Sequence, residues 1–274
     1  MEAQGCVRIR SDACGLGELV VPYPVAGRVR DGLVTGESWT SRWSATWRFD
    51  GDDVAWPVRN VTTVPMLSSE PVRRFTWRAR QRHRPGLQYI VSTGRHHGFE
   101  SLEEQRLLLA LDFMTAAEVL PQPFRLSFEH VGGRGEHKPD FLAILPGGGL
   151  WLFDVRPGNL VREADELKFA AAAEMAAACG WRYTVVTGWR RHVQSVLDQL
   201  SAQRRPLWDP LALQEQLEGA AGLVPAIAFG DLVNGTSLPA VARAHALHLL
   251  WHRRLGVDLA RPLGDASRVW RVKR

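Results

Sequence analysis

The chain has 274 residues, of which 45% are hydrophobic, 23% charged and 9% aromatic, and this composition argues against a disordered chain. Its formal net charge of +5 is a mild basic excess, which is compatible with a nucleic-acid partner but does not require one. The three cysteines, Cys6, Cys14 and Cys179, are too sparse for a disulfide scaffold, and Cys6 and Cys14 lack the second Cys/His pair of a structural zinc site.

The first residues, MEAQGCVRIRSDACG, contain no apolar stretch of the secretory type, and no apolar run is long enough to span a bilayer. We therefore expect a cytoplasmic protein without a membrane partner. Several arginines lie close together in the sequence. They could contact phosphates, or they could belong to an ordinary soluble surface. The clustered residues are Arg73, Arg74, Arg78, Arg80, Arg82, Arg84, Arg204–Arg205 and Arg253–Arg254.

Residues 1–90 are predicted to be a β-rich region of short strands and turns. In the segment SWTSRWSATWRFDG, Trp39, Trp43 and Trp47 recur among polar residues, and the segment closes on Asp50-Gly51, a hairpin signal. These tryptophans could stack on bases, but filling a small β-core is the favoured interpretation.

Residues 91–205 are predicted to form an α/β domain, a sheet layered with helices. Leucines at helical spacing, apolar runs and glycine-rich turns mark its elements. In chain order they are a helix over 100–114, a strand over 123–131, a turn at 132–135, strands over 140–145 and 150–155, a helix over 161–179, a strand over 182–188 and a helix over 189–205.

Residues 206–274 are predicted to form a separate, mostly helical domain. Helical patterns cover 211–218, about 225–233 and 238–255, and the tail RPLGDASRVWRVKR could form a β-hairpin. Three helices followed by a hairpin are the outline of a winged helix, and a helical cap that only packs fits these patterns equally well.

Two acids bracket the strand pair of the central domain. Asp140 stands at the head of the run FLAIL and Asp154 at the tail of LWLF, so a hairpin through the PGGG turn brings both to one edge. Two carboxylates held close repel each other, and a divalent cation relieves that repulsion. Their oxygens suit Mg²⁺ or Mn²⁺. The alternative is two exposed loop aspartates.

A third acid is expected from the helix over 100–114. Glu104 shares a helix face with Leu107, Leu108 and Leu111, and an inward glutamate is unusual unless it is paired or ligated. Glu100 lies on the same face and is the second choice. A metal held by such acids can activate water and stabilise charge on a phosphodiester.

These residues resemble the PD-(D/E)xK nuclease motif. Pro139-Asp140, a hairpin and then Asp154-Val155-Arg156 match its pattern, and the preceding helix supplies its usual acid. More narrowly, the ordered segments ESLEEQ, LPQPF, HKPDF, FDVRP and YTVVTG resemble the TnsA-type endonuclease subunit of heteromeric transposases. The resemblance covers about 90–190 clearly and the C-terminal region loosely, and it leaves 1–90 unexplained.

The resemblance implies a restriction-endonuclease-like core and a metal-dependent DNA endonuclease that nicks one strand at each transposon end. The partners that it implies are double-stranded DNA, a DDE-type transposase subunit and an AAA+ ATPase regulator. Carried over onto this chain, Glu104, Asp140 and Asp154 would hold Mg²⁺.

Arg156 departs from the family pattern, which has lysine at this position. A guanidinium stays protonated and cannot act as a base, but it can neutralise phosphate charge or position water. Lys168, or less plausibly Lys138, could supply the missing amine. By resemblance, Gln122 in LPQPF belongs near the same edge, and a turn contact is its structural alternative.

Three other functions remain open from the sequence. The chain could be a catalytically degenerate nuclease fold that only binds DNA or bridges proteins, an interpretation that Arg156 supports. It could be a stand-alone restriction or repair nuclease. It could also be a winged-helix regulator that reads DNA through 207–274, although that region could equally dock onto a partner protein.

Overall fold

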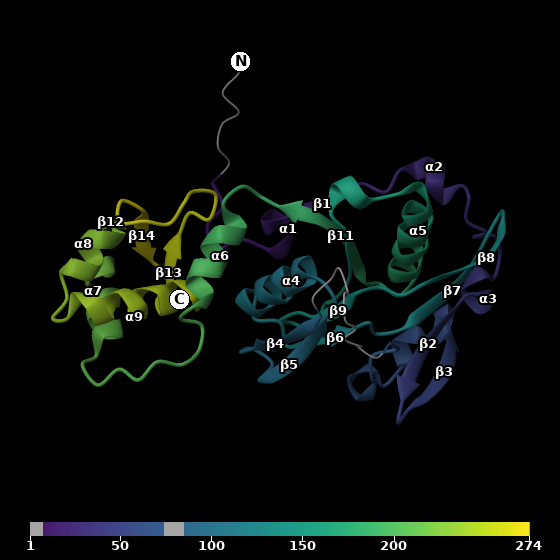
Figure 1. Cartoon of the computed structure of the whole chain (residues 1–274), viewed down its shortest axis with the longest axis horizontal. Helices are drawn as coiled ribbons and strands as arrows, with labels where there is room; N and C mark the ends of the chain where they lie inside the picture. Colours follow the sequence, from purple (N-terminus) through teal and green to yellow (C-terminus); the bar gives the residue numbers. More distant parts are fainter. Residues whose placement is uncertain (1–7, 74–84, 274) are drawn as a thin grey trace, which may run out of the picture. The chain divides into compact units, whose positions relative to one another are not determined.

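The computed structural model describes residues 8–73 and 85–273. The chain has a mixed α/β fold in which helices alternate with strands of several sheets (Figure 1). It divides into two compact units: unit 1 combines Met1–Val21 with Trp189–Arg274, and unit 2 is the intervening segment Pro22–Gly188. These limits differ from the predicted domains 1–90, 91–205 and 206–274, because strands of the first 90 residues pair with later strands of unit 2.

The central sheet of unit 2 has the strands β11-β10-β9-β6 in this order. Strands β9 and β10 carry the two apolar runs and pair as the predicted antiparallel hairpin. In its PGGG turn Gly147 (φ +91°) and Gly148 (φ +83°) are left-handed, a conformation that costs glycine little. Strand β10 pairs in parallel with β11. The bounds are β1 Val20–Pro22, β6 Glu118–Pro121, β9 Phe141–Ile144, β10 Leu150–Val155 and β11 Arg182–Trp189.

A second sheet of unit 2 has the order β3-β2-β7-β8. Its members are β2 Ser44–Phe49, β3 Asp52–Pro57, β7 Arg125–His130 and β8 Gly133–His137. Strand β2 pairs with β7, and it also forms the predicted hairpin with β3 across Asp50-Gly51. Trp43 and Trp47 are both 0% exposed, so they fill the core and have no free face for a base.

Strand β8 occupies a segment that the sequence predicts as a glycine-rich turn. Gly135 lies against the ring of Phe128 on β7, and a Cβ at Gly135 would come within 2.5 Å of that ring. The glycine therefore allows a close strand approach, and the turn is confined to the start of the segment. The strand carries the chain to His137.

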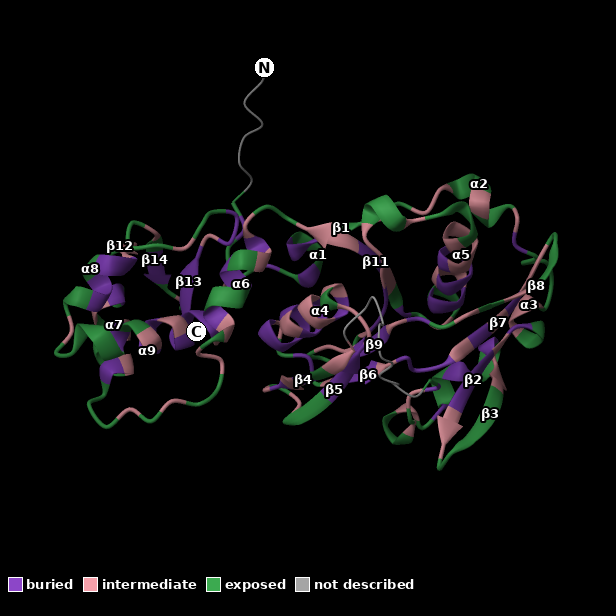
Figure 2. Ribbon diagram, in the orientation of Figure 1, coloured by how far each residue is buried: buried purple, intermediate pink, exposed green. Residues whose placement is uncertain are grey.

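The helices of unit 2 pack on these sheets. Ser101 caps α4, which packs against β4, β5 and β10. Buried alanines of α5, among them Ala171 and Ala172, share a core with Leu142 of β9 and Leu152 of β10 (Figure 2). The bounds are α2 Gly27–Arg30, α3 Trp39–Arg42, α4 Leu102–Phe113, α5 Glu163–Ala178, the 3₁₀ helices Val58–Thr63, Met66–Ser68 and Gly158–Leu160, and strands β4 Gly86–Ile90 and β5 Arg95–Phe99.

Unit 1 contains helices and a small sheet of order β12-β14-β13. The predicted helices of this region are present, except that the second begins with strand β12. The tail forms β14, whose Val269 is buried and pairs with both Ile227 and Val257. The bounds are α1 Leu16–Leu19, α6 Val193–Ser201, α7 Leu213–Gly222, β12 Ile227–Ala228, α8 Phe229–Asn234, α9 Pro239–Trp251, β13 Leu255–Val257 and β14 Arg268–Arg271.

The two ends of the chain meet within unit 1. The backbone N–H of Ser11 donates to the carbonyl of Val257 at 2.9 Å, and the N–H of Ile9 donates to Asp258 at 3.0 Å. The Arg253 guanidinium donates to the carbonyls of Ser11 (2.7 Å) and Cys14 (2.8 Å). Arg253 therefore has a structural role, although the sequence groups it with possible phosphate contacts.

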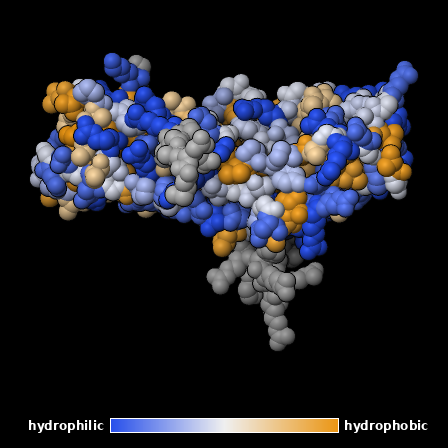
Figure 3. All heavy atoms as spheres, turned by 90° about the horizontal axis from the view of Figure 1, so that it is seen from above, coloured by the Kyte–Doolittle hydropathy of each residue, from blue (hydrophilic) through white to orange (hydrophobic). Residues whose placement is uncertain are grey.

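On the face shown in Figure 3, hydrophobic residues form separate patches among hydrophilic ones. Within residues 8–73 and 85–273, no helix has the length and apolar character that a bilayer crossing requires. Of the predicted arginine cluster, Arg73 forms an ion pair with Glu100 at 3.2 Å. Its other members, Arg74, Arg78, Arg80, Arg82 and Arg84, lie outside the described residues.

Candidate functional site

A cavity of unit 2, about 670 Å³ in volume, lies where α4 begins, β10 ends and α5 makes its first turns. We call it the carboxylate pocket. It brings together most of the site residues that the sequence predicts, with the exception of Gln122. The predicted residues that line the pocket are Glu100, Glu104, Lys138, Asp140, Asp154, Arg156 and Lys168.

The strand pairing sets Asp140 beside Asp154. The backbone N–H of Asp140, just before β9, donates to the carbonyl of Phe153 at 2.9 Å. Its side-chain Oδ2 accepts the backbone N–H of Val155 at 2.7 Å. The backbone N–H of Gln122 donates to the carbonyl of Asp140 at 2.7 Å, so Gln122 fixes this acid through its main chain.

The charges of Asp154 and Glu104 act on Asp140. Burial is the largest cause that raises the pKa of Asp140 well above its ordinary value, and the negative charges of Asp154 and Glu104 raise it further. The hydrogen bond from Val155 opposes this rise only in part. Ionised Asp140 therefore sits in an excess of negative charge, the condition that a bound cation relieves.

Glu104 is held at the start of α4 by hydrogen bonds to the two residues that precede the helix. Its Oε1 accepts the hydroxyl of Ser101 at 2.8 Å, and its Oε2 accepts the backbone N–H of Glu100 at 2.8 Å. The backbone N–H of Glu104 in turn donates to the Ser101 hydroxyl at 3.2 Å, the bond expected of an N-cap serine. The side chain is buried at 8% exposure, and burial raises its pKa. Both oxygens of Glu104 thus have local partners.

Two residues that the sequence analysis did not assign hold Asp154. His137, at the end of β8, lies with Nε2 2.9 Å from Asp154 Oδ2. Tyr183, on β11, donates its hydroxyl to the same oxygen at 2.6 Å. The side chain of Asp154 is only 4% exposed and that of His137 9% exposed. Asp154 is therefore fixed in one orientation from β8 and β11, which belong to different sheets.

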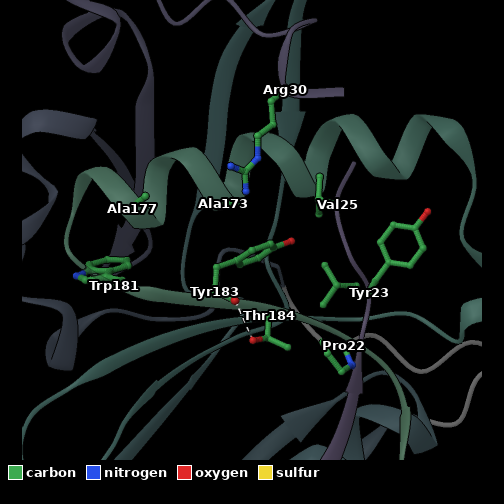
Figure 4. A pocket seen from close by; sticks show the side chains of 10 residues that line it. Pro22, Tyr23, Val25, Arg30, Ala173, Ala177, Trp181, Tyr183 and Thr184 are labelled. Carbon is green, nitrogen blue, oxygen red and sulfur yellow. Dashed lines mark hydrogen bonds between the residues drawn. The ribbon is translucent and has the colours of Figure 1, made fainter. Parts of the chain in front are cut away.

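Tyr183 also borders a second, smaller cavity of about 290 Å³ on the side of α5 (Figure 4). Figure 4 shows the Tyr183 ring lying beside α5, near Ala173, with Arg30 above it. Burial, together with the charge of Asp154, raises the pKa of Tyr183 well above its ordinary value. The hydroxyl therefore stays protonated and remains a hydrogen-bond donor at any working pH.

Arg156 contacts residues that follow it in the chain. Its Nε donates to the carbonyl of Leu160 at 3.2 Å, and its Nη2 lies 3.4 Å from Asp165 at the start of α5. Its side chain remains 41% exposed at the pocket. Lys168, almost one turn after Asp165 on α5, lines the same pocket. Arg156 and Lys168 thus line the same pocket as the acids.

The donor set has the chemistry of a site for a hard divalent cation, because its ligand atoms would be carboxylate oxygens. In the described part of the chain, no group of three or more His, Cys, Asp or Glu side chains is arranged so as to hold a metal ion. Asp140 and Asp154 suit such an ion, because the negative charge of Asp154 disfavours the ionisation of Asp140 and a cation would relieve this. Each oxygen of Glu104 accepts one hydrogen bond, from Ser101 or from Glu100, and keeps a lone pair with which it could join them.

Gln122 contacts Asp140 but is not among the residues that line the pocket. Its side chain is 5% exposed and its backbone is left-handed, with φ +42°. Among the described residues its Oε1 has no hydrogen-bond partner, a costly state for a buried polar atom. The structure thus gives Gln122 a backbone contact to Asp140, and its side chain lies near the candidate site without lining it.

No protein-family model matches this chain, and no curated protein is significantly similar to it.

Proposed function

We propose that this protein is a divalent-metal-dependent DNA endonuclease. The observation that carries the proposal is the shared pocket of Glu104, Asp140 and Asp154, in which the charges of the other two acids help to raise the pKa of Asp140. Surplus negative charge concentrated in a cavity beside cationic groups supports a site where a metal ion and a phosphate group meet.

Asp140 and Asp154 would hold Mg²⁺ or Mn²⁺, with Glu104 as a third ligand. A bound ion of this kind supplies an activated water and stabilises charge on the phosphate. His137 and Tyr183 keep Asp154 Oδ2 occupied and so orient its carboxylate. Arg156 and Lys168 would neutralise the phosphate of the scissile strand, and Lys168 is the candidate for the amine that lysine supplies in the resembling family.

We further propose that the chain acts as one subunit of a heteromeric transposase and nicks DNA at transposon ends. This proposal rests on the ordered segments that resemble TnsA-type endonucleases. The expected partners are double-stranded DNA of the transposon ends, a DDE-type transposase subunit and an AAA+ ATPase regulator.

The finer fold assignments are proposals as well. The mixed sheet β11-β10-β9-β6, with α4 before it and α5 between β10 and β11, supports a restriction-endonuclease-like core. In unit 1, the order α7-β12-α8-α9-β13-β14 and the sheet order β12-β14-β13 support a winged helix.

Asp140→Asn tests the metal site. Asparagine can still accept the N–H of Val155, so the substitution removes the charge while keeping this partly buried bond. We expect the variant to lose most Mn²⁺ binding, measured by the electron paramagnetic resonance signal of free Mn²⁺, and to lose nicking of supercoiled DNA that carries transposon ends. The nicking assay is run with and without the partners.

Asp165→Asn is the matched control, because Asp165 lines the same pocket but pairs with Arg156. It should keep Mn²⁺ binding close to that of the wild type. Wild-type nicking and Mn²⁺ binding by Asp140→Asn would refute the site assignment. Cleavage by the wild type without partners would instead support a stand-alone nuclease.

A second candidate is a catalytically degenerate nuclease fold that binds DNA or bridges proteins. Arg156 bonds to Leu160 and Asp165, and both oxygens of Glu104 serve the helix cap. This candidate predicts that the wild type binds DNA but shows no Mn²⁺ affinity above that of Asp140→Asn.

A further inference from the structure

A second concave surface lies in unit 1, within the region that the sequence left open between binding DNA and docking a protein. It is a cavity of about 1410 Å³ that we call the basic groove. Six cationic residues and two acids line it, an excess of four positive charges. Its lining includes Arg8, Arg10, Arg254, Trp270, Arg271 and Lys273.

The two acids of the groove already have partners. Asp12 pairs with Arg10 at 2.7 Å, and Glu218 accepts two hydrogen bonds from Arg254, at 2.6 and 2.8 Å. In the described residues, no acid pairs with the remaining exposed cations Arg8, Arg271 and Lys273. The groove therefore retains positive charge that its own acids do not neutralise.

Trp270 organises one wall of the groove. The guanidinium of Arg8 lies 4.5 Å and that of Arg10 4.9 Å from the centre of its ring, which is cation–π geometry. The indole is 6% exposed and donates to Asp12 at 3.2 Å. Such a covered ring cannot act as a stacking platform for bases, so the groove favours a ligand recognised by its charge.

A second cavity, about 670 Å³ in volume, continues this surface. It shares Arg8, Ala226 and Trp270 with the basic groove and adds Arg261 and Arg268. This second cavity thus adds two arginines to the cationic surface, of which Arg261 pairs with Asp258 at 3.7 Å, and a run of cations suits the regularly spaced charges of a polyanion.

The exposed positive charge of unit 1 does not lie on the helix that a winged helix would use to contact DNA. In such a fold α9 would be the helix that enters the major groove. The exposed cation of α9 is Arg243, which pairs with Asp265 at 2.6 Å. Most other side chains of this helix are apolar or buried. Helix α9 is therefore a poor candidate for contacting phosphates.

We propose that the basic groove binds the phosphate backbone of duplex DNA, apart from the carboxylate pocket and independently of α9. The choice of DNA among polyanions rests on the proposed endonuclease function. The surface would hold the duplex by charge, without reading its sequence.

The test measures binding of a fluorescent 40-base-pair duplex of arbitrary sequence to the full chain in EDTA, between 50 and 200 mM salt. The variant is Arg8→Ala/Arg271→Ala/Lys273→Ala, whose side chains are exposed and lack acidic partners. Each lost phosphate contact removes about 0.9 from the logarithmic salt slope. Over this range the wild type should therefore lose about 40-fold more affinity than the variant, since three contacts are at stake.

Two controls separate charge from structure. Arg8→Lys/Arg271→Lys keeps the positive charge and should bind DNA like the wild type. Arg243→Ala removes the exposed cation of α9 and should leave affinity and salt slope unchanged. A triple alanine variant that binds DNA with wild-type affinity and slope overturns the proposal, as does loss of binding in Arg243→Ala alone.

Poly-L-glutamate as the ligand distinguishes a protein partner. If the triple variant loses affinity for this polymer but not for DNA, the groove serves an acidic polypeptide and the proposal fails. Because the assay contains no divalent metal, groove binding by a chain that neither nicks DNA nor binds Mn²⁺ would leave this inference standing while the endonuclease proposal falls.

Discussion

Replacing Tyr183 by phenylalanine tests how Asp154 is held. The change removes one hydroxyl, which donates to Asp154 Oδ2 at 2.6 Å. Hydrogen bonds to charged groups contribute about 1.5–3 kcal/mol, and His137 still contacts the same oxygen, so we expect a loss of about 1.5 kcal/mol. In a unit of this size the melting temperature should fall by about 3–6 °C in calorimetry.

The same substitution should weaken Mn²⁺ binding about 10- to 100-fold, because groups that orient a ligand affect metal affinity to this extent. Tyr23→Phe is the matched control, since its hydroxyl donates to Glu166 at a partly exposed position. It should change stability by less than about 0.5 kcal/mol and leave Mn²⁺ binding intact. If Tyr183→Phe melts and binds Mn²⁺ as the wild type does, the bond to Asp154 does not hold the site.

Three further outcomes are expected. Without metal, Asp140→Asn should be more stable than the wild type at neutral pH, because a raised pKa means that ionising Asp140 opposes folding. In urea unfolding this difference should shrink as the pH falls through the raised pKa of Asp140 and vanish below about 3.9, where both states of the wild type are protonated. Arg156→Lys, which restores the family residue and leaves Asp165 in place, should raise nicking if the chain is a nuclease, and unchanged nicking would favour the degenerate fold. Trp47→Ala should cost about 3–5 kcal/mol in the same unfolding assay, because its side chain is fully buried, and a loss below about 1 kcal/mol would contradict its place in the core.

Local sequence patterns were enough to predict the elements around the carboxylate pocket. The helix at α4, the hairpin of β9 and β10, and the helix at α5 follow from leucine spacing, apolar runs and the PGGG turn, and all three are present. The convergence of Asp140 and Asp154 follows from that hairpin alone, since antiparallel pairing places the head of one strand beside the tail of the next.

The residues that hold Asp154 could not be predicted in the same way. His137 reaches Asp154 only because β8 is a strand, and the glycines of that segment indicate a turn when read locally. Tyr183 reaches it because β11 pairs in parallel with β10. The whole of α5 separates these two strands in the sequence, so local patterns do not reveal the pairing. The sequence HKPD places a histidine near Asp140, which could have suggested His137 as a site residue. The sequence does not indicate the direction in which the His137 ring points.

Local sequence patterns also could not predict which residues belong to unit 2. Strand β2 pairs with β7 across about 80 residues, with Ser44 opposite Ser127. No periodicity in either segment encodes that partnership, so residues 1–90 were predicted as a region of their own. Trp43 and Trp47 are buried in a core that includes residues of these strands and of α5, which confirms the core role that the sequence favoured for them.

The construction of unit 1 from both ends of the chain imposes an order on biosynthesis. Ser11 leaves the ribosome early, but its partner Val257 follows 246 residues later. At about 5–20 residues per second, the first segment waits about 12–50 s before it can pack. Unit 2 is complete before then, so nascent chains should become protease-resistant first in unit 2, and the segment that contains Ser11 should gain protection only after Val257 has been made.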